Sequence, residues 1–228
     1  MKFGQATAAA VLIAGIATTA QATVTAITPC TGANACTITT SPPNPVTQNP
    51  NDGILLLWDE VQNFTLTTAL RVDRVFDTNA SFVTAVSGGD YELAAGSIVS
   101  SHYVQWDPGN GSASTVNATI RADSQIFAFI TSDANLASSD PFLGLPGINY
   151  NTFGLRGLEV GDTTVFNGAD VDISWSAGSP GDWTRLITAY SPTAAVPVPA
   201  SGIAMLALVP MAAWMVRRRG RLSNKTAS

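Results

Sequence analysis

The sequence predicts an all-β domain, a two-layer antiparallel β-sandwich of jelly-roll type. From Gly53 onward, short runs alternate apolar and polar residues, so every second side chain can face a core. These runs are rich in β-branched and aromatic residues, and Gly, Pro, Asn or Asp interrupts them every dozen or so positions. About eight such runs in roughly 140 residues fit a sandwich.

Eight strand segments are expected, in the order 54–61, 69–76, 81–86, 97–107, 114–122, 125–131, 170–176 and 182–190. In the seventh, Val171, Ile173 and Trp175 alternate with acids and serines, which predicts one buried and one solvated face. The segment 125–131 is apolar on both faces and is therefore expected to be central in its sheet.

One short helix is expected over residues 132–144. Ser132 or Asp133 can cap its first turn. Pro141 is expected to stop it, because proline lacks the N–H that a helix interior requires.

The N-terminus has the parts of a secretory signal peptide over residues 1–22. Lys2 precedes an apolar run over 6–20, and the small residues Ala20 and Ala22 form a cleavage site. The run is shorter than the roughly 20 residues of a membrane span. The chain is therefore expected to be exported, with the mature protein beginning near Thr23.

The C-terminal tail, residues 194–228, predicts a marginal membrane helix over 200–216. That uncharged segment would reach about 25 Å as a helix, slightly less than the ~30 Å hydrocarbon core. The basic residues after it are expected to stay cytoplasmic. The prolines before it favour an extended strip that a processing enzyme can reach.

This tail resembles the PEP-CTERM class of sorting signals, in particular its VPLPA-type variant, although Val198 stands where that variant usually has leucine. The residues that carry the resemblance are Val196, Pro197, Val198, Pro199, Ala200, Arg217, Arg218 and Arg219. The resemblance implies a Gram-negative bacterium that makes extracellular polysaccharide, and processing by an exosortase-type transpeptidase. An ordinary tail anchor is the alternative. Motifs in the middle of the chain, such as "GDWTRLIT", resemble other proteins with this tail, a group without an assigned activity.

The charge of the exported part excludes nucleic acid as a partner. Six of the eleven basic residues lie in the two ends, and all sixteen acidic residues lie between them, which leaves the middle with a net charge of −11. Such a surface repels phosphates, whose recognition needs a basic patch. Divalent cations and neutral sugars remain compatible with it.

The two cysteines, Cys30 and Cys36, predict a disulfide, because the chain is expected in an oxidising compartment and their spacing is not that of a CxxC motif. They lie in an N-terminal arm, 23–52, whose Pro/Asn-rich linker separates it from the ectodomain, 53–193.

No constellation of residues predicts catalysis. The single histidine, His102, shares its parity with apolar residues and is expected at a core edge, and there is no G-x-S-x-G motif. Glycoside hydrolysis needs two facing carboxyls. The pairs Asp59 and Glu60, and Asp170 and Asp172, are instead expected on solvated strand faces.

A structural calcium ion is the one cofactor that the sequence leaves open. Calcium takes six to eight oxygen ligands, which Asp- and Asn-rich loops can supply. The weak candidates are Asp107, Asp133, Asp140, Asp162 and Asp170, which are also ordinary turn residues. Sugars could stack on exposed aromatic rings, and Tyr150 is the side chain most expected to be exposed.

We therefore expect a non-enzymatic protein of the cell envelope or extracellular matrix. It would be anchored transiently in the inner membrane and could associate with extracellular polysaccharide. A carbohydrate-binding module with a structural calcium is the alternative, and a glycoside-acting enzyme is the third reading.

Overall fold

Strands dominate the computed structural model, which describes residues 24–109, 113–178 and 180–190. The described part contains one helix, and its strands pair antiparallel except for β2 and β3. The predicted all-β class is thereby confirmed. All eight expected segments contain strand, although 69–76 is divided at Asp73 into two strands.

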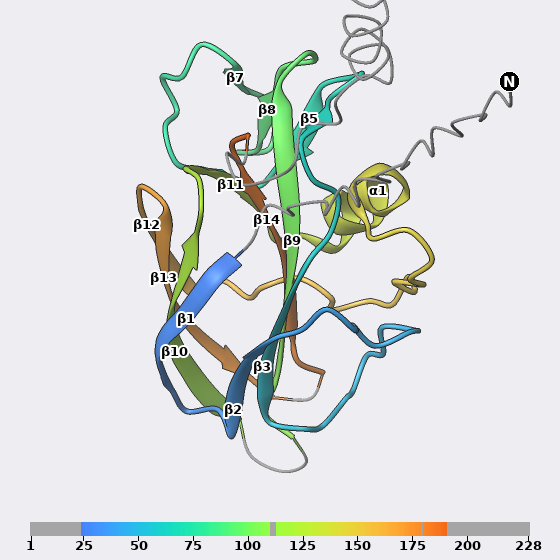
Figure 1. The fold of residues 1–228 in the computed structure, drawn as a ribbon, viewed down its shortest axis with the longest axis vertical. Helices are drawn as coiled ribbons and strands as arrows, with labels where there is room; N and C mark the ends of the chain where they lie inside the picture. The colour runs from blue at the N-terminus through green and yellow to red at the C-terminus, as the bar shows by residue number, and fades with distance from the viewer. Residues whose placement is uncertain (1–23, 110–112, 179, 191–228) are drawn as a thin grey trace, which may run out of the picture. The chain divides into compact units, whose positions relative to one another are not determined.

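The strands form three sheets (Figure 1). The four-stranded sheet has the order β1 (Val24–Thr31), β10 (Ser114–Ala122), β13 (Asp170–Ala177) and β12 (Thr163–Asn167). The seven-stranded sheet has the order β2 (Ala35–Ile38), β3 (Ile54–Asp59), β9 (Ile98–Asp107), β14 (Asp182–Thr188), β11 (Ile126–Ile130) and β6 (Arg74–Val75), and β4 (Phe64–Thr65) pairs with β9. The three-stranded sheet has the order β5 (Leu70–Val72), β8 (Tyr91–Leu93) and β7 (Val83–Ala85).

The four-stranded and seven-stranded sheets share one hydrophobic core. Val116 and Trp175 come from the first sheet, and Leu57, Trp106 and Leu186 come from the second. In β10 and β13 every second side chain is buried in this core, and the side chains between them are more exposed. This is the alternation of apolar and polar residues seen in the sequence. At about 25 cal/mol per Å² of buried apolar surface, such a layer supplies much of the stability of a domain.

A second core covers the other face of the seven-stranded sheet. Tyr103 and Trp183 of that sheet pack there with Leu136 and Leu143 of the helix α1 (Asp133–Leu143). Figure 1 accordingly shows α1 and the strands β10 and β13 on opposite sides of β9 and β14. Every described residue of β14 is buried, because both faces of this strand are covered. The segment 125–131 is central as predicted, since β11 lies between β14 and β6.

The N-terminal segment belongs to both sheets and is not a separate arm. β1 pairs with β10 of the four-stranded sheet, and β2 pairs in parallel with β3 of the seven-stranded sheet. Cys30 of β1 and Cys36 of β2 form a disulfide and pack against the first core. The linker 41–53 runs between β2 and β3 without regular structure.

The helix lies within the expected range and begins as predicted, but Pro141 does not stop it. Ser132 is the N-cap, and its hydroxyl accepts a hydrogen bond from the amide of Asn135. The expectation that Pro141 stops the helix is wrong, because α1 continues to Leu143. Burial of Leu136 and Leu143 in the second core offsets the hydrogen bond that proline cannot make.

Within the described ranges, no helix is long and apolar enough to cross a membrane. The predicted signal peptide, 1–22, with its cleavage residues Ala20 and Ala22, lies outside the described residues. The same holds for the membrane helix 200–216 and for the sorting residues Val196–Ala200 and Arg217–Arg219.

Candidate functional site

Three carboxylates converge at one end of the two large sheets. Glu159, Asp162 and Asp182 each place an oxygen within 4.8 Å of the others. Glu159 and Asp162 lie in the turn before β12 of the four-stranded sheet, and Asp182 is the first residue of β14 in the seven-stranded sheet. Asp107, the last residue of β9, lies near enough to act on the charge of Asp182. We call these four residues the acidic cluster.

The backbone around the acidic cluster is positioned by close packing. A Cβ at Gly181 would lie 2.1 Å from the carbonyl oxygen of Trp106 and 2.8 Å from Cα of Asp107, so only glycine lets the start of β14 approach the end of β9. The turn is held by Asp162, whose Oδ2 accepts a hydrogen bond from the amide of Glu159 and whose Oδ1 accepts one from the amide of Ser176.

The electrostatics of the acidic cluster centre on Asp182, which is fully buried. Neither of its carboxylate oxygens accepts a hydrogen bond from the described residues, and Oδ2 of buried Asp107 also lacks one. Burial raises the pKa of Asp182 to about 9, and the neighbouring carboxylates of Glu159, Asp162 and Asp107 act in the same direction. Asp182 without a cation therefore favours its protonated form at neutral pH.

Chemically, the acidic cluster offers only oxygen ligands, which suit a hard cation such as Ca²⁺. Two of the five predicted calcium candidates, Asp107 and Asp162, belong to it. Sequence reasoning missed Glu159 and Asp182, because nothing in the spacing of the four acids shows that two sheets bring them together.

The other three calcium candidates have structural partners elsewhere, so the structure does not bring them into the cluster. Asp133 accepts hydrogen bonds from the amides of Leu155, Arg156 and Gly157, which fixes the loop that leads to Glu159. Asp170 forms a paired ion bridge with Arg121 at the surface, and this hydrogen-bonded guanidinium lowers the pKa of Asp170.

Asp140 belongs to a buried network built around two arginines. The guanidinium of Arg156 donates to both oxygens of Asp140, at 2.6 and 2.8 Å, and its Nε donates to the hydroxyl of Tyr103. Arg185 donates to both oxygens of Glu60, at 2.6 and 2.8 Å, and to Asp140 at 3.0 Å. Burial lowers the pKa of Arg185, but the Glu60 and Asp140 carboxylates outweigh it, so the net pKa is raised.

The expectation that Asp59 and Glu60 lie on a solvated face is wrong. Glu60 directly follows β3 and is only 3% exposed, because its carboxylate lies in the buried network and forms an ion pair with Arg185. Asp59 accepts a hydrogen bond from the imidazole of His102, with 2.6 Å between Oδ1 and Nδ1. Asp170 and Asp172 remain at the surface as predicted, and the alternating residues Val171 and Ile173 are buried.

His102 lies between a carboxylate and a hydroxyl, an arrangement that superficially resembles a catalytic triad. Its Nε2 is 3.1 Å from Oγ1 of Thr188. His102 and Thr188 are both fully buried, because β9 lies between β3 and β14. No substrate reaches a hydroxyl in that position, so the three side chains serve the packing of the sheet.

The aromatic side chains considered for sugar stacking are buried. Tyr150, expected to be the most exposed, is 5% exposed, because its hydroxyl accepts a hydrogen bond from the amide of Leu145 and its ring packs on Tyr103. The sequence offers four tryptophans as further stacking candidates, most of which are expected to be buried. Each is at most 1% exposed: Trp58, Trp106, Trp175 and Trp183.

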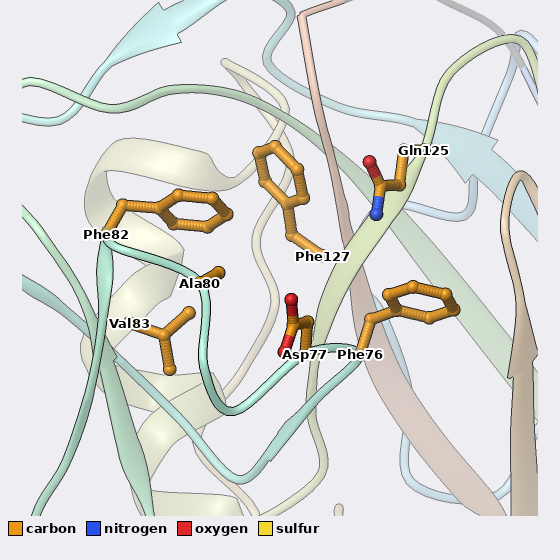
Figure 2. A pocket seen from close by; sticks show the side chains of 7 residues that line it. All are labelled: Phe76, Asp77, Ala80, Phe82, Val83, Gln125 and Phe127. Carbon is orange, nitrogen blue, oxygen red and sulfur yellow. The ribbon is translucent and has the colours of Figure 1, made fainter.

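One pocket of about 170 Å³ is lined by phenylalanines instead (Figure 2). The rings of Phe82 and Phe127 lie 4.7 Å apart, and in this view the Asp77 carboxylate lies between them and Phe76. Gln125 supplies an amide to the same pocket. The lining is thus mainly apolar, with two polar side chains.

Comparison of the chain with protein-family models, with curated proteins and with solved structures finds no match.

Proposed function

We propose that this chain is an exported, non-enzymatic protein of the Gram-negative cell envelope or extracellular matrix. A signal peptide would export it, and an exosortase-type transpeptidase would process it at Val196–Ala200. The observation that carries the proposal is the order of three features at the C-terminus: the proline strip, the apolar run and the arginine cluster. Their resemblance to the PEP-CTERM class distinguishes this tail from a simple anchor.

The bonding of the described domain supports the non-enzymatic part of the proposal. His102, Glu60, Asp140 and both buried arginines are occupied by partners inside the fold. His102, Glu60 and both arginines are also buried, so they are not exposed to a substrate.

For the fold, we propose a sandwich of jelly-roll type around the core that the two large sheets share. The mainly antiparallel pairing supports this reading. Two features would be additions to a jelly roll: β2, which pairs in parallel with β3, and the separate three-stranded sheet.

Intact-mass measurement of the natural protein tests the sorting proposal. The wild-type chain should lack both its signal peptide and its tail beyond the proline strip. Replacing Pro197 and Pro199 by alanine, with the apolar run and the arginines kept, should leave the tail uncleaved in the inner membrane. Pro192→Ala, outside the motif, is the matched control and should be processed normally.

A mature wild-type protein with an intact tail, in a cell that has the transpeptidase, would contradict the proposal. Deleting Val196–Ser228 should release the domain into the medium. Release by the deletion, together with a tail that is retained in both the wild type and the double alanine variant, would instead identify an ordinary tail anchor.

The pocket in Figure 2 favours a second candidate function, carbohydrate binding. Sugar rings stack on aromatic side chains and bond to carboxylates and amides, and this pocket offers all three. A glycan array should then show binding that Phe76→Ala and Gln125→Ala abolish. Val165→Ala, at an exposed position on the four-stranded sheet, should bind like the wild type.

A further inference from the structure

We propose that the acidic cluster is a calcium site, with Glu159, Asp162 and Asp182 as side-chain ligands and Asp107 beside them. This inference goes beyond the envelope function and does not depend on processing of the tail. Water molecules and backbone carbonyls would complete the six to eight oxygens that Ca²⁺ requires.

The bonding of Asp182 carries the inference. A fully buried carboxylate is ordinarily stabilised by hydrogen-bond donors or by a cation. Both oxygens of Asp182 lack a donor in the described part of the chain, and one oxygen of buried Asp107 lacks one too. Here the orphaned oxygens belong to a group whose ligand atoms already converge within 4.8 Å.

Among the described residues, no arginine forms an ion pair with a carboxylate of the acidic cluster. Four of the five arginines of the domain form the ion pairs described above or the Arg71–Asp90 pair at the surface. The fifth, Arg74, donates to the backbone carbonyl of Asp162 at 3.2 Å. Within the described part of the chain, the acidic cluster therefore has no paired arginine side chain, and a divalent ion would balance the negative charge of its ionised carboxylates.

The donor set selects calcium among the common ions. Zinc prefers cysteine and histidine, which are absent from the cluster. Magnesium binds through few carboxylates and keeps most of its water, whereas calcium accepts three or more carboxylates in irregular geometry.

A calcium ion here would join the two large sheets. Asp162 belongs to the turn before β12 and bonds to the amide of Ser176 in β13, both on the four-stranded sheet. Asp182 and Asp107 end neighbouring strands of the seven-stranded sheet. The ion would thus close one end of the sandwich.

Terbium luminescence and thermal unfolding of the full chain in detergent test the inference. Tb³⁺ replaces Ca²⁺ and is sensitised by tryptophan, and Trp106 and Trp183 are chain neighbours of two cluster residues. Wild-type protein should show saturable emission that Ca²⁺ competes away and Mg²⁺ competes away only weakly. At one hundred times its Kd, Ca²⁺ should raise Tm by roughly 5–10 °C.

Asp182→Asn should abolish both signals. Its Tm in chelator should equal or exceed that of the wild type, since asparagine is neutral and similar in size to the protonated aspartic acid that this position favours without a cation. Glu159 is exposed, so Glu159→Gln should leave folding intact. The substitution should weaken the affinity for Ca²⁺ at least about tenfold through loss of one charged ligand. Asp172→Asn, an exposed carboxylate on β13, is the matched control. Binding unchanged in Glu159→Gln, or no Ca²⁺-dependent shift in the wild type, would overturn the proposal.

Discussion

The buried arginines show how single residues in this chain are matched in charge. Arg185 and Glu60 are both fully buried at the side chain, yet each finds its counterpart across 125 residues of sequence. Arg156 and Arg185 also lie over the rings of Tyr103 and Tyr150, at 5.3 to 5.6 Å from the ring centroids. Geometry of this kind satisfies the guanidinium donors and offsets the cost of burial.

Glu60→Gln should destabilise the protein by about 3–5 kcal/mol, because it leaves Arg185 buried with less compensation. Urea unfolding would measure this loss. Asp170→Asn makes the same chemical change in the pair with Arg121, where the arginine side chain is 61% exposed, and should leave the free energy of unfolding nearly unchanged. Equal effects of the two variants would show that burial does not matter for this network.

At the scale of the elements, the ends of strands and of the helix are set by particular residues. Asp73 divides the run 69–76, since its carboxylate accepts hydrogen bonds from the amides of Thr131 and Ser132 and so binds the start of α1. Gly181 allows β14 to begin beside Asp107. Neither effect has a signature in hydrophobic periodicity, because each depends on a segment distant in sequence.

Gly181→Ala should cost about 1–3 kcal/mol, because the new Cβ would collide with backbone atoms of Trp106 and Asp107. Chemical denaturation gives the value. At Gly154 an added Cβ has no neighbour within 4 Å, so Gly154→Ala is the control and should be close to neutral. If Gly181→Ala leaves the free energy of unfolding unchanged, β9 and β14 are farther apart in solution than in this structure.

Pro141→Ala should stabilise the protein by about 1–2 kcal/mol, since alanine restores a helical hydrogen bond and outweighs the lower chain entropy of unfolded proline. The midpoint of thermal unfolding should rise. Ser132→Ala, which removes the N-cap, should lower it. A fall in stability for Pro141→Ala would indicate that the helix is strained into place by packing on the second core.

For the molecule as a whole, the seven-stranded sheet is the organising layer. It packs one face against the four-stranded sheet and the other against α1 and the second core. The short crossing from β1 to β2 carries the chain from one large sheet to the other, and the Cys30–Cys36 disulfide closes that crossing. Together with the acidic cluster, these links join the two sheets at their ends.

Replacing Cys30 and Cys36 by serine should destabilise the protein by about 2 kcal/mol, the loop-closure value for so small a ring. Equilibrium unfolding of the double variant gives the value. Wild-type protein in reductant should reach the same stability, which is the internal check. No difference between the oxidised and reduced forms would show that β1 and β2 hold their places without the bond.

The sequence by itself determined the all-β class, the eight strand segments and the central place of 125–131, because side-chain alternation and turn residues act over short distances. It also determined the acidic charge of the domain and the pattern of the two ends. Only the tertiary structure decided which polar residues meet. Glu60 with Arg185, His102 with Thr188, and Asp182 with Asp162 are joined by strand pairing and sheet packing, and local periodicity contains no information about such distant contacts.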